Sequence, residues 1–541
     1  MPLDDAAGGV AGGATGGGPG RVTRSGPPAP ASASGAPGEP YDVVVVGAGV
    51  VGTAIARELA RHPLRTAVVE ASDDVGEGTS KANTAILHTG FDAVPGSLEA
   101  RLVQDGYRRL TAYAAQCGIP VERTGALLVA WDGDQLAALP GLLEKAKRNG
   151  YEEAVLLDAA EVVAREPHLG LGALGALDVP GESIICPWTT PLAYVTQAVA
   201  AGVDLHLNCR VTGVEPDAGD LHALTTTRGP LRTRHLVNAA GLHADTVDRM
   251  LGHDTFTVTP RRGQLIVFDK PARDLVRHIL LPVPTALGKG VLVAPTVYGN
   301  VLLGPTAEDL DDKQATESTA DGLHRLREQG ARVLPGLLDE DVTTAYAGLR
   351  AATEDDDYRI HARPGQRLVT VGGIRSTGLT ASMAIAAHVT DLLADCGLDL
   401  GGPPRDLPPL TVPNLGENFP RPYQRADLIA ADPEYGTVVC HCERVTRGEI
   451  RDALASTVPP ASIDGLRRRT RARGGRCQGF YCGAAVRELF EGREGGEGRE
   501  GHESGEGGEG RTSGEGGEGR TSGEGRGEPE RREVRGRAER R

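Results

Sequence analysis

Residues 41–72 read YDVVVVGAGVVGTAIARELARHPLRTAVVEAS, and this stretch decides the fold. The β-branched run at 43–46 is typical of a strand that is buried on both faces of a parallel sheet. It leads into a GxGxxG turn and then into a helical stretch at 53–61. A second strand is predicted at 65–69, and Glu70 follows it. Strand, glycine turn, helix, strand and acid in this order predict an α/β domain that binds a dinucleotide.

The three glycines of the turn, Gly47, Gly49 and Gly52, have separate tasks. Together they allow a tight turn, a close approach of the backbone to a pyrophosphate, and close packing of helix on strand. The helix N-terminus then faces the phosphates with its partial positive charge. Glu70 would accept hydrogen bonds from a ribose 2′-hydroxyl, which argues against NADP but does not separate NAD from FAD. A glycine-rich turn without a ligand is the alternative, and the ordered context makes it a minority case.

Three later segments separate FAD from NAD. Residues 235–245 read HLVNAAGLHAD, a strand that breaks into a turn of small residues. Residues 372–380 read GGIRSTGLT, a strand end and glycine turn before a predicted helix at 381–393. Residues 78–90 read GTSKANTAILHTG, a polar loop soon after the second strand. With the glycine fingerprint, these motifs resemble the D-amino-acid-oxidase-type family of FAD-dependent oxidoreductases over roughly residues 40–400.

The resemblance implies FAD as the cofactor and a substrate domain that is inserted between pieces of the FAD domain. We therefore expect an α/β fold, in which a Rossmann-type FAD-binding domain carries an inserted α+β substrate domain, mainly at 100–185 and 255–345. The residues that the resemblance assigns to FAD are Gly47, Gly49, Gly52, Glu70, Thr79, Ser80, Asn83, Val211, Ala240, Gly241, Gly373, Gly378, Leu379 and Thr380.

The substrate site needs a base for the proton that leaves an O–H or N–H group, and a group that holds the substrate. An anionic substrate favours arginine, whose planar fork pairs with a carboxylate or phosphate through two hydrogen bonds. Arg350, in AGLR at 347–350, and Arg375, in the GGIRSTGLT turn, stand where the family's anion-binding residues stand. A solvated or structural arginine is the alternative for each. Arg262 and Lys289 are weaker candidates for the same pocket.

His88 is predicted to be a catalytic or flavin-contacting residue, because AILHTGFD at 85–92 resembles the family's segment that passes the isoalloxazine ring. Some relatives attach the flavin covalently to a histidine in this region, and the sequence does not decide whether this chain does. His243 and His361 are alternatives. A structural histidine is nearly as frequent an outcome for any of the three.

Further segments resemble two kinds of dehydrogenase that act on 2-hydroxy compounds, the L-2-hydroxyglutarate dehydrogenases and the glycerol-3-phosphate dehydrogenase type. Both substrates carry a secondary alcohol and an anion, which suits two arginines but does not choose between carboxylate and phosphate. The segments are NTAILHTGFD at 83–92, PGSLEARL at 95–102, PVPT with GKG at 282–290, and GNVLLGPT at 299–306.

Four of the eight cysteines gather in TVVCHCERVTRGEI at 437–450 and RRTRARGGRCQGFYCG at 468–483. Four thiolates from two short loops can hold a [2Fe–2S] cluster or a tetrahedral zinc ion. Thr446 and Glu449 form a capping-box pattern, which predicts a helix just after the first cysteine pair. A second helix is predicted at 484–490. Both helix N-termini, with the neighbouring arginine run, would place positive charge beside an anionic cluster.

This second region resembles the bacterioferritin-associated-ferredoxin-like [2Fe–2S] domain, a small helical domain, over about residues 436–490. The resemblance implies that Cys440, Cys442, Cys477 and Cys482 hold a [2Fe–2S] cluster. Structural zinc is the main alternative. The same appendage occurs in the large subunit of the anaerobic-type glycerol-3-phosphate dehydrogenase, which favours glycerol 3-phosphate over 2-hydroxyglutarate.

Composition gives the remaining domain boundaries. The Gly/Ala/Pro/Ser-rich segment at 1–39 and the Gly/Glu/Arg tail at 491–541 are predicted to be disordered, because they offer too little apolar surface to offset the entropy of ordering. The oxidoreductase is expected at 40–405 and the cluster domain at 436–490. The Pro-rich segment at 406–435 is predicted to be an extended linker.

The net charge of −15 does not favour a nucleic-acid partner. No apolar run approaches eighteen residues, so no transmembrane segment is expected, and the N-terminus lacks the apolar core of a secretory signal. We therefore expect a cytoplasmic protein, at most peripheral at the inner face of the membrane through partners.

These observations favour an enzyme that oxidises sn-glycerol 3-phosphate to dihydroxyacetone phosphate by hydride transfer to FAD. Electrons would then pass through the [2Fe–2S] cluster to electron-accepting partner subunits or a membrane quinone pool. One alternative keeps the fold and changes the substrate to L-2-hydroxyglutarate or an amino acid. The other is a non-catalytic module for electron transfer or iron mobilisation.

Overall fold

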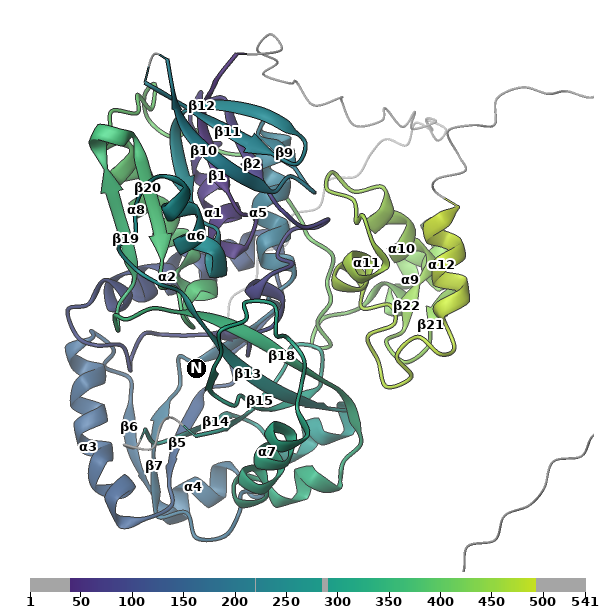
Figure 1. Ribbon diagram of the computed structural model, residues 1–541. Helices are drawn as coiled ribbons and strands as arrows, with labels where there is room; N and C mark the ends of the chain where they lie inside the picture. The colour runs from purple at the N-terminus through teal and green to yellow at the C-terminus, as the bar shows by residue number, and fades with distance from the viewer. Residues whose placement is uncertain (1–38, 219, 285–289, 493–541) are drawn as a thin grey trace, which may run out of the picture. The chain divides into compact units, whose positions relative to one another are not determined.

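The computed structural model describes residues 39–218, 220–284 and 290–492 (Figure 1). The two predicted disordered segments, 1–39 and 491–541, lie almost entirely outside these residues.

The first of two large sheets includes the strand that leads into the glycine fingerprint. Its β1 (Tyr41–Val46) lies between the parallel strands β2 (Thr66–Val69) and β12 (Gly229–Asn238). The four valines of β1 are buried, as expected for a strand covered on both faces. The remaining strands of this eight-stranded sheet are β9 (Asp204–His206), β10 (Val211–Asp217), β11 (Leu221–Thr226), β19 (Arg359–Arg363) and β20 (Leu368–Gly372).

Helices cover this sheet and confirm two predictions. The helix expected after the glycine turn is α1 (Val50–Leu59), and the helix expected after the GGIRSTGLT turn is α8 (Gly378–Asp395). The helices α1 and α8 pack against each other, and α2 (Leu98–Cys117) packs against α8. Most of α2 falls within the stretch assigned from sequence to the substrate domain, but its packing places it with the helices of the FAD-type sheet. The other helices in this part are α5 (Thr189–Ala200) and α6 (Ala244–Met250).

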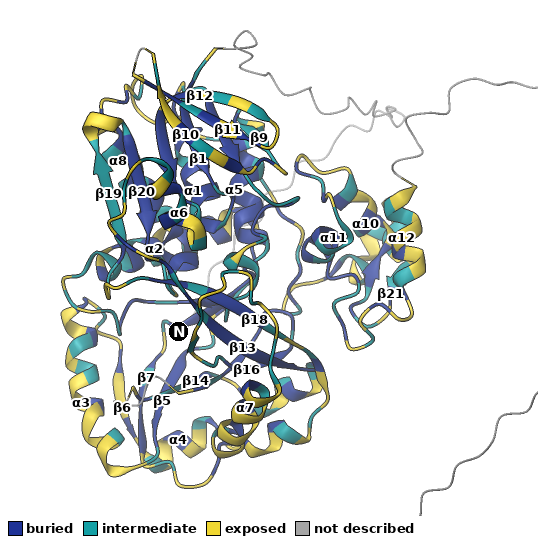
Figure 2. Cartoon of the chain, in the orientation of Figure 1, coloured by how far each residue is buried: buried dark blue, intermediate teal, exposed yellow. Residues whose placement is uncertain are grey.

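The second large sheet has nine strands, drawn from two separate parts of the chain. Its first part, 126–179, and its second, 259–352, are divided by strands of the first sheet, so this sheet is an insertion. The strands are β5 (Ala126–Ala130), β6 (Val155–Asp158), β7 (Gly175–Val179), β13 (Thr259–Phe268), β14 (Ile279–Pro282), β15 (Leu292–Pro295), β16 (Val301–Gly304), β17 (Glu308–Asp309) and β18 (Val342–Ala352). Amphipathic helices with exposed outer faces cover it, namely α3 (Gly133–Arg148), α4 (Ala159–Arg165) and α7 (Ala320–Val333) (Figure 2).

A small three-stranded sheet joins distant segments beside these two. In it, β8 (Ser183–Ile185) lies between β3 (Ile86–Leu87) and β4 (Val121–Glu122). The antiparallel register pairs Leu87 with Ser183, so the residue after β3 and the residue before β8 come to the same end.

The cysteine-bearing region forms a small hairpin and three helices around its own apolar core. The hairpin is β21 (Val438–Cys440) with β22 (Val445–Thr446). The predicted capping box is confirmed: Thr446 Oγ1 accepts from the Glu449 amide, and the Glu449 carboxylate accepts from the Thr446 amide (2.8 Å). The helices are α10 (Arg447–Leu454), α11 (Ile463–Thr470) and α12 (Gly483–Glu491). The last of these confirms the helix that was expected at 484–490.

The segment predicted to be a linker is extended at first, as its prolines dictate, but it is not a free linker. Val412 and Leu415 are buried against the main core, and the Val412 amide donates to the Cys117 carbonyl (2.9 Å). The chain then forms the short helix α9 (Ala426–Ala431). Aliphatic side chains between the prolines give this segment a face to bury, which composition alone did not reveal. Short 3₁₀ helices lie at Thr79–Lys81, Gly241–His243, Lys270–Leu275, Pro335–Asp339, Pro364–Gln366, Pro422–Gln424 and Pro433–Gly436.

Candidate functional site

The glycine turn between β1 and α1 has no room for side chains. Gly47 has a φ of +104°, and a Cβ there would lie 2.5 Å from the carbonyl oxygen of Ala239. A Cβ on Gly52 would lie 1.9 Å from the carbonyl oxygen of Gly47. The turn thus lies directly against the second predicted turn, which contains Ala240 and Gly241. Such a turn leaves backbone amides at the start of a helix, where a pyrophosphate can bind.

Glu70 lies at the end of β2, beside the glycine turn. Its carboxylate accepts hydrogen bonds from the amides of Ala48 (2.7 Å) and Ser72 (2.8 Å). Its carbonyl oxygen accepts from the amide of Cys209 (2.7 Å), which brings the start of β10, at Val211, to the same end of the sheet. Each carboxylate oxygen keeps further lone-pair capacity, so the arrangement can also accept from a ribose hydroxyl.

The polar loop that follows is held at both ends. Ser80 Oγ accepts from the Val50 amide (2.9 Å) at the start of α1 and lies 3.3 Å from the position that a Cβ on Gly49 would take. The Thr79 hydroxyl donates to a carbonyl of β18 (2.8 Å). Asn83 closes the loop by donating to the Ser80 carbonyl (2.8 Å). The loop is therefore fixed between the fingerprint helix and a strand of the inserted sheet.

The N-terminus of α8 meets the end of the same loop. Gly373, in the turn before the helix, has a φ of +68°. Gly378, Leu379 and Thr380 form the first turn of the helix and are buried. The Thr380 hydroxyl accepts from the amide of His88 (3.0 Å). Amides without a helical acceptor and the positive end of the helix dipole suit an anionic group at this position.

His88 forms a pair with Glu182, which sequence reasoning missed. The antiparallel pairing of β3 with β8 places them opposite each other, with His88 Nδ1 2.9 Å from Glu182 Oε2. Glu182 is fully buried, and its other oxygen accepts from the Thr89 amide (2.7 Å) and hydroxyl (2.9 Å). No motif marks Glu182, because only the pairing of two short strands brings it to a histidine 94 residues away.

Arg350 lies on β18, opposite Arg261 of β13. One of its nitrogens lies 3.0 Å from the position of a Cβ on Gly263, and another donates a long hydrogen bond to the Thr306 carbonyl (3.4 Å). Within the described part of the chain Arg350 has no ion-pair partner, whereas Arg261 pairs with Asp309. Burial, followed by the charge of Arg261, lowers the pKa of Arg350, but arginine stays cationic because its ordinary pKa is so high.

Arg375 lies in a different setting, because carboxylates already balance its charge. Its guanidinium donates to Asp356 Oδ1 (2.8 Å) and lies 3.7 Å from Glu99 Oε2. The structure therefore does not present it as an available cation, and its predicted role as an anion binder stays a prediction. Arg262, the weaker candidate, pairs with two glutamates of the inserted domain.

The two alternative histidines lie elsewhere. His243 ends the 3₁₀ turn after the NAAG segment, and burial, aided by the charge of Lys313, lowers its pKa. His361 lies on β19 opposite Thr370, and burial lowers its pKa as well. Neither belongs to the His88–Glu182 pair. Lys289 lies outside the described residues.

The four cysteines predicted as cluster ligands come together from two loops, as two thiol pairs. Cys442 is hydrogen-bonded to Cys477, and Cys440 to Cys482. Burial opposes ionisation of Cys477, but backbone amides at 479–481 and the Cys442 thiol outweigh it and lower the pKa of Cys477. Burial and the neighbouring Cys440 raise the pKa of Cys482 to about 12.

This donor set fits a two-iron cluster, because a [2Fe–2S] centre held by four cysteines takes two thiolates on each iron. Backbone amides aimed at a sulfur atom also suit an anionic cluster. In the described residues, no group of three or more His, Cys, Asp or Glu side chains is arranged to hold a single metal ion.

The arginine run before Cys477 makes contacts that differ from its expected role as positive charge beside the cluster. Instead of only adding charge at the cluster, it reaches both the FAD-type domain and the inserted domain. Arg468 and Arg469 donate to the buried carboxylate of Asp74, and the Arg471 guanidinium lies 4.2 Å from the ring centroid of Tyr298. The sequence could not show this, because the partner acid lies almost four hundred residues away.

Within the described ranges, no helix has the length and apolar character needed to cross a bilayer.

Comparison with known proteins gives two family matches. The family model described as "FAD dependent oxidoreductase", DAO, matches residues 42–392. The model described as "BFD-like [2Fe-2S] binding domain" matches residues 438–492. The two matches cover the two regions in which the nucleotide-type turn and the four thiols lie.

Individual relatives point the same way. A glycerol 3-phosphate dehydrogenase of Caloramator mitchellensis is 36% identical over 83% of this chain and 93% of its own length. A mitochondrial L-2-hydroxyglutarate dehydrogenase of Nematostella vectensis is 27% identical, over 66% of this chain and 91% of its own length. Among solved structures, an L-α-glycerophosphate oxidase of Mycoplasma pneumoniae with FAD bound aligns with a TM-score of 0.63 and 29% identity, covering 70% of this chain and 97% of that one.

The first family match spans well over half of the chain and includes both glycine turns, the polar loop and the start of α8. The FAD-bound structural relative shares the same mixed α/β architecture. The chain therefore belongs to the DAO family of FAD-dependent oxidoreductases and carries a C-terminal BFD-like [2Fe–2S] domain.

Proposed function

We propose that this enzyme oxidises the secondary alcohol of sn-glycerol 3-phosphate to the ketone of dihydroxyacetone phosphate. The observation that carries the proposal is that the half-buried Arg350 has no ion-pair partner among the described residues. It lies on the strand that binds the loop leading to His88. Oxidation of an anionic alcohol needs a cation for the anion and a base for the hydroxyl proton. The relative at 36% identity, which is a glycerol 3-phosphate dehydrogenase, supports this choice of substrate.

FAD would lie along the line of backbone amides and polar groups described above. The glycine turn and the start of α1 would hold the pyrophosphate, and Glu70 the ribose. The start of α8 would face the flavin ring. The other residues assigned to this site are Thr79, Ser80, Asn83, Val211, Ala240, Gly241 and Gly373.

His88 acts as the base for the C2 hydroxyl of the substrate. The Glu182 carboxylate accepts at Nδ1, so Nδ1 carries the hydrogen and Nε2 keeps the lone pair that receives the proton. When bound, FAD supplies the acceptor for the hydride that leaves C2. Loss of the hydroxyl proton to His88 and of the hydride from C2 leaves the C=O bond of the product. The imidazolium that forms is then stabilised by Glu182.

Arg350 holds the phosphate and thereby fixes the position of C2 relative to His88. A guanidinium offers two parallel N–H donors to a phosphate, and partial burial strengthens that interaction because less water competes for it. The phosphate replaces the long contact that Arg350 makes with the Thr306 carbonyl.

Cys440, Cys442, Cys477 and Cys482 would hold the [2Fe–2S] cluster, which would supply a one-electron acceptor for the reduced flavin. The final acceptor is a partner subunit or a membrane quinone pool. A one-electron centre beside a two-electron cofactor suits an enzyme that passes electrons to another redox centre.

L-2-hydroxyglutarate is the second candidate substrate. It too carries a secondary alcohol beside an anion, Arg350 would pair with its carboxylate as well as with a phosphate, and the Nematostella vectensis relative supports it. An anaerobic dye-reduction assay of the full chain with each substrate separates the two candidates. We expect turnover with glycerol 3-phosphate, and turnover with L-2-hydroxyglutarate alone would overturn the first assignment.

A further inference from the structure

A fully buried carboxylate lies at the centre of the loop that joins the ribose-binding acid to the flavin loop. Asp74 belongs to the FAD-type domain and follows Glu70 by four residues. Its Oδ1 accepts from Arg469 Nη2 (2.7 Å), and its Oδ2 accepts from Arg469 Nη1 (2.6 Å) and Arg468 Nη2 (2.9 Å). Arg469 therefore makes a two-pronged pair with Asp74, the strongest geometry open to a guanidinium and a carboxylate.

Both arginines come from α11 of the [2Fe–2S] domain and are almost completely buried. The remaining N–H groups of Arg469 donate to the carbonyls of Val458 and Gly465, so each of its donors is satisfied. Arg468 also pairs with Glu77 (2.5 Å), three residues further along the loop from Asp74. The contact therefore involves two acids of one loop and two arginines of one helix.

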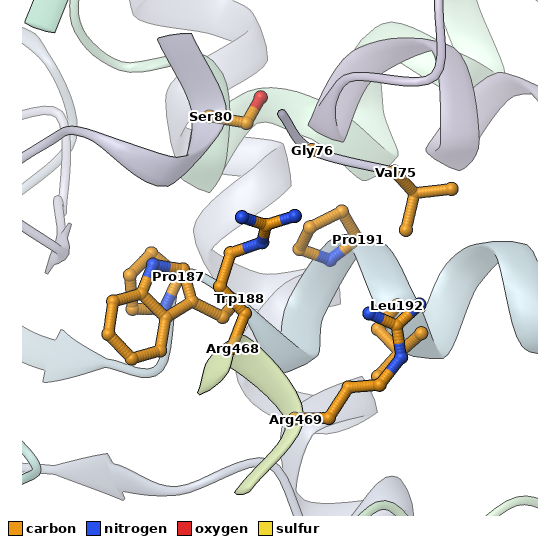
Figure 3. A pocket seen from close by; sticks show the side chains of 9 residues that line it. All are labelled: Val75, Gly76, Ser80, Pro187, Trp188, Pro191, Leu192, Arg468 and Arg469. Atoms are coloured by element: carbon orange, nitrogen blue, oxygen red, sulfur yellow. The ribbon is translucent and has the colours of Figure 1, made fainter. Parts of the chain in front are cut away.

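The helix can approach Asp74 only because Gly465 has no side chain. A Cβ on Gly465 would lie 2.5 Å from Asp74 Oδ2. Figure 3 shows the guanidinium groups of Arg468 and Arg469 lining one pocket with residues of the loop. The loop residues in that pocket are Val75, Gly76 and Ser80.

The loop around Asp74 is tied to the glycine turn on either side of the buried acid. Glu70, before it, accepts from the Ala48 amide (2.7 Å), and the Gly76 amide, after it, donates to the Ala48 carbonyl (2.9 Å). At its far end Ser80 accepts from the amide at the start of α1. A shift of Asp74 would thus move both the acid that binds ribose and the serine beside the pyrophosphate position.

We propose that Arg468 and Arg469 are positioning residues of the FAD site, supplied by the [2Fe–2S] domain. The iron–sulfur domain thereby holds the FAD-binding loop closed and contributes to FAD affinity, in addition to carrying electrons. Without its arginine partners the Asp74 carboxylate would be buried and unpaired, which is strongly unfavourable, so the loop would open to hydrate it. The inference concerns cofactor binding and is independent of which substrate the enzyme oxidises.

The test measures FAD affinity in the full-length protein. We expect Arg469→Ala to weaken FAD binding at least tenfold, as judged by release of free-flavin fluorescence on dilution. Arg469→Lys should recover part of the affinity, because lysine restores the charge without the two-pronged geometry. The matched control is Arg467→Ala, on the same helix, whose side chain pairs with Asp464 and not with Asp74. It should bind FAD as the parent does.

Two further variants change other residues of the same contact and test the proposal in case Arg469→Ala fails to fold. Asp74→Asn changes only the FAD-type domain, and Gly465→Ala pushes the helix away from the loop. Each should weaken FAD binding at least tenfold, while the dithionite-bleachable cluster absorption and the far-ultraviolet circular dichroism stay at parental levels. Parental FAD affinity in Asp74→Asn, or an equal loss of affinity in Arg467→Ala, would overturn the inference.

Discussion

His88 Nδ1 lies 2.9 Å from Oε2 of Glu182, and the carboxylate of that pair is completely shielded from solvent. The pair exists because Leu87 and Ser183 are partners in an antiparallel ladder, which brings the next residue on one strand opposite the preceding residue on the other. Glu182 is also held by the amide and hydroxyl of Thr89, so it cannot turn away from the imidazole. An ionised Glu182 therefore favours the tautomer of His88 that carries its hydrogen on Nδ1.

Replacing His88 or Glu182 should slow flavin reduction. His88→Ala removes the proposed base, and general-base catalysis contributes on the order of 10²–10⁴-fold in rate. Glu182→Gln would donate to Nδ1 instead of accepting from it, and so place the hydrogen on the wrong nitrogen. We expect a rate reduction that approaches that of His88→Ala, measured anaerobically by stopped-flow bleaching of the flavin with saturating substrate.

A second pair of a half-buried histidine and a buried glutamate provides the control for this prediction. Glu166 is fully buried, and its Oε1 lies 2.6 Å from His278 Nδ1, in the inserted domain. Glu166→Gln should lower thermal stability but leave the rate of flavin reduction within about twofold of the parent. If Glu182→Gln and Glu166→Gln slowed flavin reduction equally, the assignment of His88 as the base would be wrong.

Replacing Arg350 should impair substrate binding more than the chemical step. Hydrogen bonds to a charged group contribute about 1.5–3 kcal/mol, which predicts a decrease in kcat/KM of roughly tenfold to 150-fold for Arg350→Met. Arg350→Lys should lie between that variant and the parent, and both should act chiefly through KM. The control is Arg261→Lys on the neighbouring strand, whose charge is already paired with Asp309. An unchanged KM in Arg350→Met would remove this residue from the substrate site.

The sequence was sufficient to predict the elements that local patterns determine. The four-valine run, the glycine turn and the strand before Glu70 follow one another within thirty residues, and the structure contains each of them. The capping box of Thr446 and Glu449 was equally readable, because its two side chains lie three residues apart. Such features depend on spacing alone.

The contacts that sequence did not reveal all join distant segments. Glu182 has no motif, and its partner is fixed only by the pairing of two short strands. From sequence, the arginines of α11 were interpreted only as positive charge beside the cluster, and their partner Asp74 became visible only in the structure. The Pro-rich segment looked like a linker because its few buried aliphatic residues are separated by prolines. In each case the role of the residue depends on the surface that it contacts, and the sequence of one segment does not identify that surface.

Replacing a cluster cysteine should remove the cluster without affecting FAD binding or flavin reduction. Cys477→Ser should abolish the broad visible absorption that dithionite bleaches, because one of four thiolate ligands is lost. FAD should stay bound, and reduction of the flavin by substrate should continue at the parental rate. The matched control is Cys396→Ser, which changes a buried cysteine at the end of α8, far along the chain from the cluster loops. A Cys477→Ser protein that keeps the full cluster spectrum would contradict the ligand assignment.

The fingerprint glycines predict loss of cofactor on the smallest substitution. Gly52→Ala would place a Cβ within 1.9 Å of the Gly47 carbonyl oxygen, so the turn and the helix must separate. We expect the purified variant to contain little FAD, measured from the flavin absorbance after denaturation. Gly133→Ala is the control, because a Cβ there meets no atom within 4 Å, and this variant should keep its full FAD content.

Acid should release the loop that Asp74 holds. Burial raises the pKa of Asp74, but the hydrogen bonds and charges of Arg469 and Arg468 outweigh it, so the pKa lies below its ordinary value. A carboxyl whose pKa is depressed in the folded state stabilises that state above its unfolded pKa of about 3.9, and this contribution is lost as the pH falls through the folded value. The other charged groups around the pair are Glu77, which contacts Arg468, and Asp464, which also contacts Arg468.

We therefore expect FAD release to increase as the pH is lowered below about 4, with a steeper dependence in the parent than in Asp74→Asn. The asparagine variant should release FAD more readily at neutral pH and change little on acidification, because it has no proton to take up at this position. Flavin fluorescence recorded between pH 6 and about pH 3 measures both curves. Identical pH profiles for the two proteins would show that another group controls acid release, and Asp74 would then have no part in it.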